Sequence, residues 1–156
     1  MKRILFVILL IPILFIASCG GNVDSISSNK PYIDAITPDK TFGSEGEAIN
    51  IVVSVKNPTK VNYNGNVLIQ ADSPRCFGMG NVRVGNQNLE GYIGEINVLS
   101  GNKNSAKIEM EIPQRNEELC YSPTTDHKLT VFLLQEGETN ELNILDSKDF
   151  EFSLFE

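Results

Sequence analysis

The stretch Ile49–Lys56, INIVVSVK, places apolar side chains at its odd-numbered positions and mostly polar ones at its even-numbered positions. Ala106–Ile112, AKIEMEI, alternates without interruption, and Phe150–Leu154, FEFSL, does the same. Because successive side chains of a strand point to opposite faces, this period of two indicates strands with one face in a core and one in solvent. Beyond the N-terminal leader no segment shows the 3.6-residue period of an amphipathic helix, so the chain is predicted to be all β.

Weaker alternation marks further strands, and turn-forming pairs such as Asn57-Pro58 and Gly101-Asn102 separate them. Leu129–Leu134 is continuously apolar, which is typical of a central strand covered on both faces. Gly65 and Gly94 lie inside two of the weaker runs and are predicted to form bulges. The predicted strands are Tyr32–Ile36, Ala48–Lys56, Asn64–Ala71, Gly91–Leu99, Ser105–Ile112, Lys128–Gln135 and Lys148–Leu154, with Val82–Val84 as an additional short edge strand.

About seven short strands at nearly regular spacing predict an immunoglobulin-like antiparallel β-sandwich. Pro31–Pro38, PYIDAITP, followed by Gly46 and an alternating strand that ends before Asn57, resembles the opening of the prokaryotic Ig-like domains of the cell-adhesion-related (CARDB) type. Leu99–Gly101, ahead of the next alternating strand, resembles a later turn of those domains. The resemblance spans roughly residues 31–154 and implies an extracellular binding or spacing module, with no catalytic residue to carry over.

The first residues have the form of a signal peptide. Lys2 and Arg3 precede the apolar run Ile4–Ile16, which Pro12 alone interrupts. As a helix this run reaches about 20 Å, too short for a hydrocarbon core of about 30 Å. The pattern therefore predicts a signal peptide that is removed, and not a stable membrane span.

The residues Ile16-Ala17-Ser18-Cys19 resemble the lipobox of prokaryotic lipoproteins, in which two small residues precede the cysteine that becomes residue one. The resemblance implies acylation of Cys19 and an extracytoplasmic location on the cell membrane or the outer membrane. Two or more acyl chains give a stable anchor, whereas one binds only weakly. Two alternatives stay open: a plain signal peptide that happens to precede a cysteine, and a short uncleaved signal anchor.

These features predict three parts: residues 1–18 as signal peptide, 19–30 as lipidated cysteine and flexible Gly/Ser/Asn-rich tether, and 31–156 as the sandwich domain. Loss of Lys2 and Arg3 with the leader takes the formal charge from −7 to −9. An acidic chain argues against a nucleic-acid partner and against a polybasic grip on anionic lipid.

Two cysteines, Cys76 and Cys120, remain once Cys19 is acylated. An even number outside the cytoplasm favours a disulfide. Consecutive antiparallel strands alternate in direction, so the loops that hold these two cysteines are expected at the same end of the sandwich. Free thiols and a metal or redox role remain as alternatives.

The loop around the first of these cysteines is the most unusual segment. Arg75, Phe77 and Met79 lie in a Gly-rich context, and Tyr121 follows Cys120. An arginine beside apolar side chains on an ordered loop is typical of a recognition surface, so these four residues form the candidate binding face. In the alternative interpretation, Phe77 and Met79 fold back and cap the open end of the sandwich.

Other candidates for chemistry are weak. Asp39, Glu45 and Glu47 cluster around a predicted turn and could offer oxygen ligands to calcium, although the EF-hand spacing is absent. Glu109 and Glu111 share the outward face of a strand and are expected to be solvated. The single histidine, His127, stands at a loop–strand boundary and is expected at the surface.

No catalytic constellation is visible, and no cofactor is expected. The sequence therefore predicts a non-catalytic envelope lipoprotein held to the membrane by its lipid, with another envelope protein or a glycan as partner. Two alternatives are a calcium-stabilised spacer and an accessory domain of an envelope hydrolase system, which would need a pocket with converging carboxylates.

Overall fold

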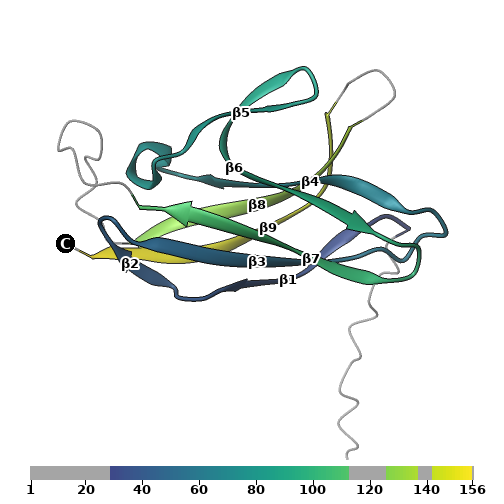
Figure 1. The fold of residues 1–156 in the computed structure, drawn as a ribbon, viewed down its shortest axis with the longest axis horizontal. Helices are drawn as coiled ribbons and strands as arrows, with labels where there is room; N and C mark the ends of the chain where they lie inside the picture. Colours follow the sequence, from purple (N-terminus) through teal and green to yellow (C-terminus); the bar gives the residue numbers. More distant parts are fainter. Residues whose placement is uncertain (1–28, 113–125, 137–141, 156) are drawn as a thin grey trace, which may run out of the picture.

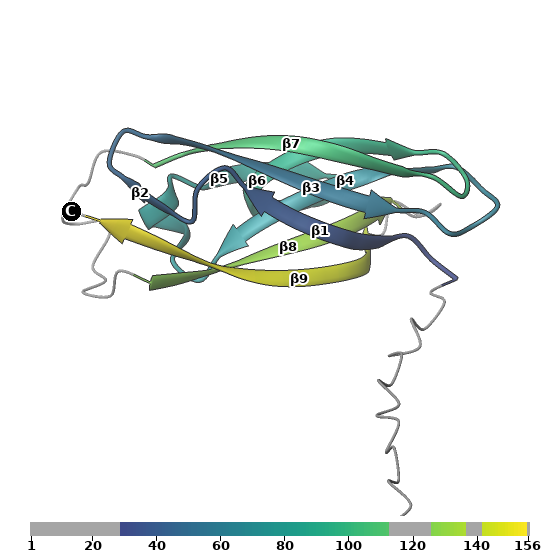
Figure 2. The same ribbon diagram turned by 90° about the horizontal axis from the view of Figure 1, so that it is seen from below.

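The computed structural model describes residues 29–112, 126–136 and 142–155, which form two β-sheets packed face to face (Figures 1 and 2). One sheet has the order β1-β3-β7 and the other β2-β9-β8-β4-β6-β5. All pairings are antiparallel except that of β2 with β9. This is the immunoglobulin-like sandwich that the period of two predicted. The elements are β1 (Tyr32–Pro38), β2 (Phe42–Ser44), β3 (Ala48–Lys56), β4 (Tyr63–Ala71), the 3-10 helix η1 (Pro74–Phe77), β5 (Gly80–Val84), β6 (Gln87–Val98), β7 (Lys103–Glu111), β8 (Asp126–Glu136) and β9 (Leu142–Phe155).

The predicted strands are all present, and β3 has the predicted bounds. The edge strand predicted at Val82–Val84 is β5. β2 was not predicted, because three residues are too few to show a period. This strand forms by parallel pairing of Phe42 with Ser153 of β9. The strand predicted at Lys148–Leu154 is shorter than β9, because residues 142–147 do not alternate. They are held as a strand by their pairing with β8.

The core lies between the sheets, and β3 is at the centre of one of them. The side chains of Ile49, Ile51, Val53 and Val55 have no exposed surface. They belong to one cluster with the inner side chains of the larger sheet. Figure 2 shows β3 lying over β8 and β9. The larger sheet contributes Val67, Ile69, Ile96, Val98, Leu129, Val131, Leu133 and Phe152.

A second, smaller apolar cluster covers the outer face of the larger sheet. Leu68 of β4 and Leu134 of β8 pack there with Val84, beneath the β5–β6 hairpin. Half-buried side chains of the hairpin and of β8 and β9 surround them: Val82, Leu89, Ile93, Phe132 and Leu142. β8 is therefore covered on both faces, as its continuous apolar run predicted.

Gly65 and Gly94 do not form bulges, which corrects the prediction. The pairing of β4 with β6 keeps its register through both residues. A Cβ at Gly65 would lie 2.1 Å from the hydroxyl oxygen of Tyr63 and 2.3 Å from the carbonyl oxygen of Leu134, two atoms that hydrogen-bond to each other at 2.7 Å. A Cβ at Gly94 would meet the side chain of Ile108 at 2.9 Å. Glycine is needed at these positions for close approach of neighbouring groups.

Side chains of the larger sheet close both edges of the three-stranded sheet. At the β1 edge, the Ile33 N–H donates to a carboxylate oxygen of Asp146 at 2.7 Å, and Lys148 Nζ donates to the Asp34 carbonyl at 3.2 Å. At the β7 edge, the Glu111 N–H donates to the Tyr92 hydroxyl at 3.3 Å. These contacts occupy backbone groups that an open edge would offer to another strand.

Candidate functional site

The candidate binding loop forms the single turn η1 between β4 and β5. Pro74 begins the turn, where its fixed φ fits and its missing N–H is not needed. Gly78 ends it with a φ of 59°, a left-handed conformation that glycine adopts without a steric penalty. The N–H groups of Gly78 and Met79 donate back to the carbonyls of Arg75 and Pro74 at 3.3 and 3.1 Å. The loop is therefore a defined turn that holds its side chains in fixed directions.

Those directions correct the candidate binding face. Phe77 has no exposed surface and Met79 only 7%, so both belong to the core and neither is presented to a partner. They fold back over the open end of the sandwich, as the alternative interpretation expected, because burying them removes a large apolar area from water. Arg75 is exposed. Tyr121 lies outside the described residues, so its place in the face stays a prediction.

His127 is buried, with 3% of its surface exposed, and the expectation of a surface residue is wrong. Its ring meets the ring of Phe77 edge to face, with centroids 5.1 Å apart. Its Nδ1 lies 3.3 Å from a carboxylate oxygen of Asp72, and the second oxygen of Asp72 accepts the Lys128 N–H at 3.2 Å. Because a carboxylate only accepts, Nδ1 is the donor in this contact, and Asp72 joins the end of β4 to the start of β8.

Sequence reasoning missed this pair because its members are 55 residues apart. The signal that could have found it is strand pairing. Ala71 is opposite Leu129 in the β4–β8 ladder, so Asp72, the next residue, necessarily lies beside the start of β8. The histidine supports the cap formed by η1 through its ring contact with Phe77.

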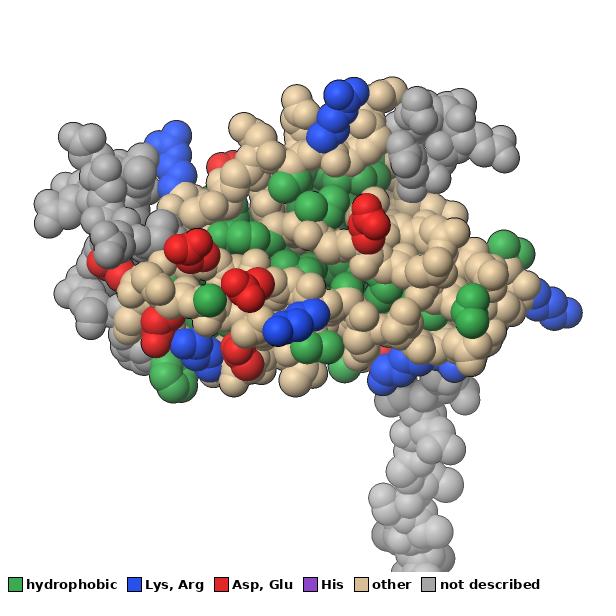
Figure 3. Space-filling model, in the orientation of Figure 1, with side chains coloured by type: hydrophobic (Ala, Val, Ile, Leu, Met, Phe, Trp, Pro, Cys, Tyr) green, Lys and Arg blue, Asp and Glu red, His purple; other side chains and the backbone are tan. Residues whose placement is uncertain are grey.

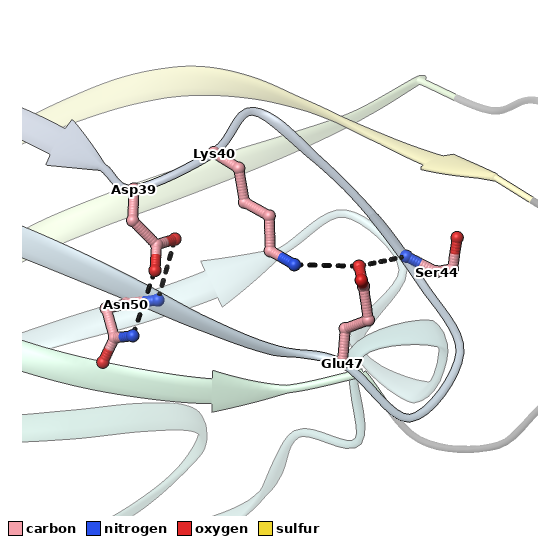
Figure 4. A network of polar contacts seen from close by, with 5 residues as sticks. All are labelled: Asp39, Lys40, Ser44, Glu47 and Asn50. Carbon is pink, nitrogen blue, oxygen red and sulfur yellow. Dashed lines mark hydrogen bonds and ion pairs between the residues drawn. The ribbon is translucent and has the colours of Figure 1, made fainter.

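The carboxylates proposed as calcium ligands contact protein donors instead (Figure 4). Asp39 accepts the backbone N–H and the side-chain amide of Asn50 at 3.1 and 3.0 Å. Glu47 accepts the Ser44 N–H and pairs with Lys40, both at 2.9 Å. Hydrogen bonding from Asn50 holds the pKa of Asp39 below its ordinary value, and the hydrogen bond from Lys40 does the same to the pKa of Glu47.

Glu45, the third of these residues, is exposed in the turn. Within residues 29–112, 126–136 and 142–155, no three His, Cys, Asp or Glu side chains lie close enough together to hold a metal ion. Glu109 and Glu111 of β7 are exposed, as expected from the alternation. The geometry of these acidic side chains is that of a hydrogen-bonded and solvated surface.

The cysteine pair is described only in part. Cys76 lies on η1, with 6% of its surface exposed, at the end of the sandwich where β4 leads into β5. Cys120 lies outside the described residues, so their pairing stays a prediction. No helix within the described segments has the length and apolar character needed to cross a bilayer.

Comparison with known proteins finds solved structures with a similar fold. No family model and no curated protein matches the chain. Among solved structures, it is similar to the C-terminal domain of wzt, with a TM-score of 0.51 and 9% identity over 82% of this chain and 75% of that one. It is also similar to the Pseudomonas fluorescens alkylpurine DNA glycosylase AlkC bound to DNA containing an abasic site analog, with a TM-score of 0.50 and 14% identity.

The match to the glycosylase covers 81% of this chain but only 31% of the glycosylase, so this chain spans about a third of the length of that protein. A further similar structure is the CARDB domain of a Pyrococcus furiosus protein in complex with di-metal ions, with a TM-score of 0.42 and 8% identity over 81% of this chain and 86% of that one. At such identities the similarities to the wzt domain and to the glycosylase show the fold alone.

The burial of Phe77 generates a prediction. Phe77→Ala should lower the free energy of unfolding by about 3–5 kcal/mol, because it leaves a cavity beneath His127 and Phe152. Arg75→Ala, two residues earlier in the turn and exposed, should change the free energy of unfolding by less than about 0.5 kcal/mol. Urea denaturation followed by circular dichroism measures both. Equal midpoints for the two variants would show that Phe77 is not part of the core.

Proposed function

We propose that this chain is an extracytoplasmic lipoprotein, anchored to a membrane through Cys19, whose sandwich domain has a non-catalytic binding or structural role in the cell envelope. The observation that carries the proposal is the sequence Ile16–Cys19 directly after a short apolar leader, where the cysteine is the residue that takes the lipid. The fold supports it, because a sandwich with a closed core can stand on a tether and present its loops.

The binding role is assigned to the end of the sandwich that holds η1. Arg75 is exposed there on a turn with fixed geometry, and Tyr121 is the other remaining member of the proposed face. An arginine on a rigid loop suits recognition of carboxylates or of planar and hydroxylated groups, which envelope proteins and glycans offer. The partner we propose is accordingly another envelope protein or a glycan.

A disulfide between Cys76 and Cys120 is part of the proposal. It would close 44 residues of chain and stabilise the fold by roughly 4 kcal/mol through the lost entropy of the unfolded state. Cys76 supports this by its position on η1, which follows β4; Ala71 at the end of β4 pairs with Leu129 near the start of β8.

Anchoring is tested by intact-mass spectrometry of the full chain isolated from a bacterium that processes lipoproteins. The mature protein should begin at Cys19 and carry acyl chains, and alkylation should add two groups only after reduction. Cys19→Ser should remove the acyl mass and release the protein from the membrane fraction. An unmodified N-terminus at another residue would contradict the anchor, and alkylation without reduction would contradict the disulfide.

The binding face is tested by photo-cross-linking in the native envelope. With a benzophenone amino acid in place of Arg75, we expect an adduct of one defined mass. The same replacement at Arg83, which is exposed on β5, is the matched control and should give several-fold less adduct. Equal labelling from both positions, or none from position 75, would remove Arg75 from the binding face.

A further inference from the structure

One end of the domain, which we call the tether end, gathers the point where the described chain begins and two turns. It consists of residues 29–31, the β3–β4 connection at 57–62, the β6–β7 connection at 99–102 and the adjoining strand residues Lys56 and Lys103. Strand register brings them together, because Lys56 is paired with Tyr32 of β1 on one side and with Lys103 of β7 on the other. In Figure 1 these segments lie at the right, opposite β2 and the C-terminus.

Two large apolar side chains protrude from this end. Val61 is 72% exposed and Leu99 is 57% exposed, one on each turn. A single exposed apolar residue is ordinary on a protein surface. Two on adjacent turns of one end, with the core closed behind them, call for an apolar or interfacial neighbour. Figure 3 shows apolar side chains standing out at this end of the molecule.

The turns that carry them are held rigidly. Asn57 is fully buried, and its side-chain amide donates to the carbonyls of Val61 and Val98 at 2.8 and 3.0 Å. Between the turns, the Gly101 N–H donates to the Thr59 carbonyl at 3.2 Å, and the Ser100 N–H donates to the side chain of Asn62 at 3.0 Å. This bracing places Val61 and Leu99 at fixed positions outside the core.

The charges of the tether end are all of one sign. The segments 29–33, 54–63 and 97–105 contain Lys30, Lys56, Lys60 and Lys103, and no aspartate or glutamate. Two described acids outside these segments contact them: Asp34 pairs with Lys103, and Asp146 accepts the Ile33 N–H. Most of the acidic side chains on the face shown in Figure 3 lie in the half of the molecule that contains β2. The chain is acidic as a whole, but the fold separates its charges.

The length of chain between Cys19 and the domain limits how far the tether end can lie from the membrane. Nine residues lie between Cys19 and Asn29, and the ten Cα–Cα steps between these two span at most about 35 Å even when fully extended. The far end of the sandwich is about 30 Å further away, the length of the nine-residue β3. With the lipid on Cys19, as proposed above, the tether end stays within about 35 Å of the bilayer, whereas the far end can lie about 65 Å away.

We infer that the tether end rests on the surface of an anionic phospholipid bilayer, with Val61 and Leu99 in the headgroup region and Lys56 and Lys60 beside the phosphates. Apolar tips flanked by lysines are suited to this interface, and each lysine near an anionic surface strengthens binding about fivefold. The η1 end then points away from the membrane, toward a partner. This inference rests on the proposed anchor and adds to it the orientation of the domain relative to the membrane.

The chain has no tryptophan, so a single introduced tryptophan reports its own surroundings. Val61→Trp, Leu99→Trp and, as control, Phe42→Trp on β2 replace side chains that are 72%, 57% and 55% exposed. The acylated full-length products are reconstituted in vesicles of phosphatidylglycerol and phosphatidylcholine with brominated acyl chains. Quenching should be several-fold stronger at positions 61 and 99 than at 42. Exchange of phosphatidylglycerol for phosphatidylcholine should reduce it, as should Lys60→Gln.

The outcomes separate the inference from the anchor. Acyl chains on Cys19 with equally weak quenching at positions 61, 99 and 42 would overturn the inference and leave the anchor in place. A tryptophan at position 61 shielded from both brominated lipid and aqueous iodide would show that a protein covers this end, which also overturns it. If the mass shows no acyl chains, quenching of the unanchored variants by added anionic vesicles decides the inference alone, and its absence overturns it.

Discussion

The burial of one face of β3 is the constraint on which the rest of the structure depends. Ile49, Ile51, Val53 and Val55 are completely enclosed, and each such side chain contributes roughly 1.5–3 kcal/mol by leaving water. A slip of one residue would turn all four outward, so the register of β3 with β1 and β7 is strongly determined. The two sheets, and the positions of every loop at their ends, follow from that register.

A core between two sheets is open at its edges and at its two ends, and this chain closes each opening differently. Polar side chains such as Asp146 and Tyr92 close the edges by occupying backbone groups of β1 and β7. At one end Phe77 and His127 close the core with apolar and aromatic surface. At the other end the buried side chain of Asn57 braces two turns, which leaves Val61 and Leu99 outside. The ends therefore differ in chemistry, and the proposed functions differ with them.

Features that depend on a residue and its near neighbours could be predicted from the sequence, and features that depend on pairing could not. The alternation in β3 and β7 is local, and so is the apolar run of β8. The need for glycine at position 65 arises from a hydrogen bond between Tyr63 and Leu134, 71 residues apart. His127 looked like a surface residue because Asp72 and Phe77 reach it only through the fold. The net charge of the chain did not predict the lysines gathered at the tether end, because lysines and acidic residues are separated only in the folded structure.

The measurement that tests the central claim most directly compares two adjacent valines of β3. Val53 has no exposed surface and faces the core, whereas Val52 is half-buried on the other face, opposite Lys107. A carboxylate at position 53 would be buried without a partner, at a cost comparable to the 5–15 kcal/mol stability of a whole domain. Val53→Asp should abolish cooperative thermal unfolding, and Val52→Asp should keep it. Cooperative unfolding of the Val53→Asp variant near the wild-type temperature would contradict the account.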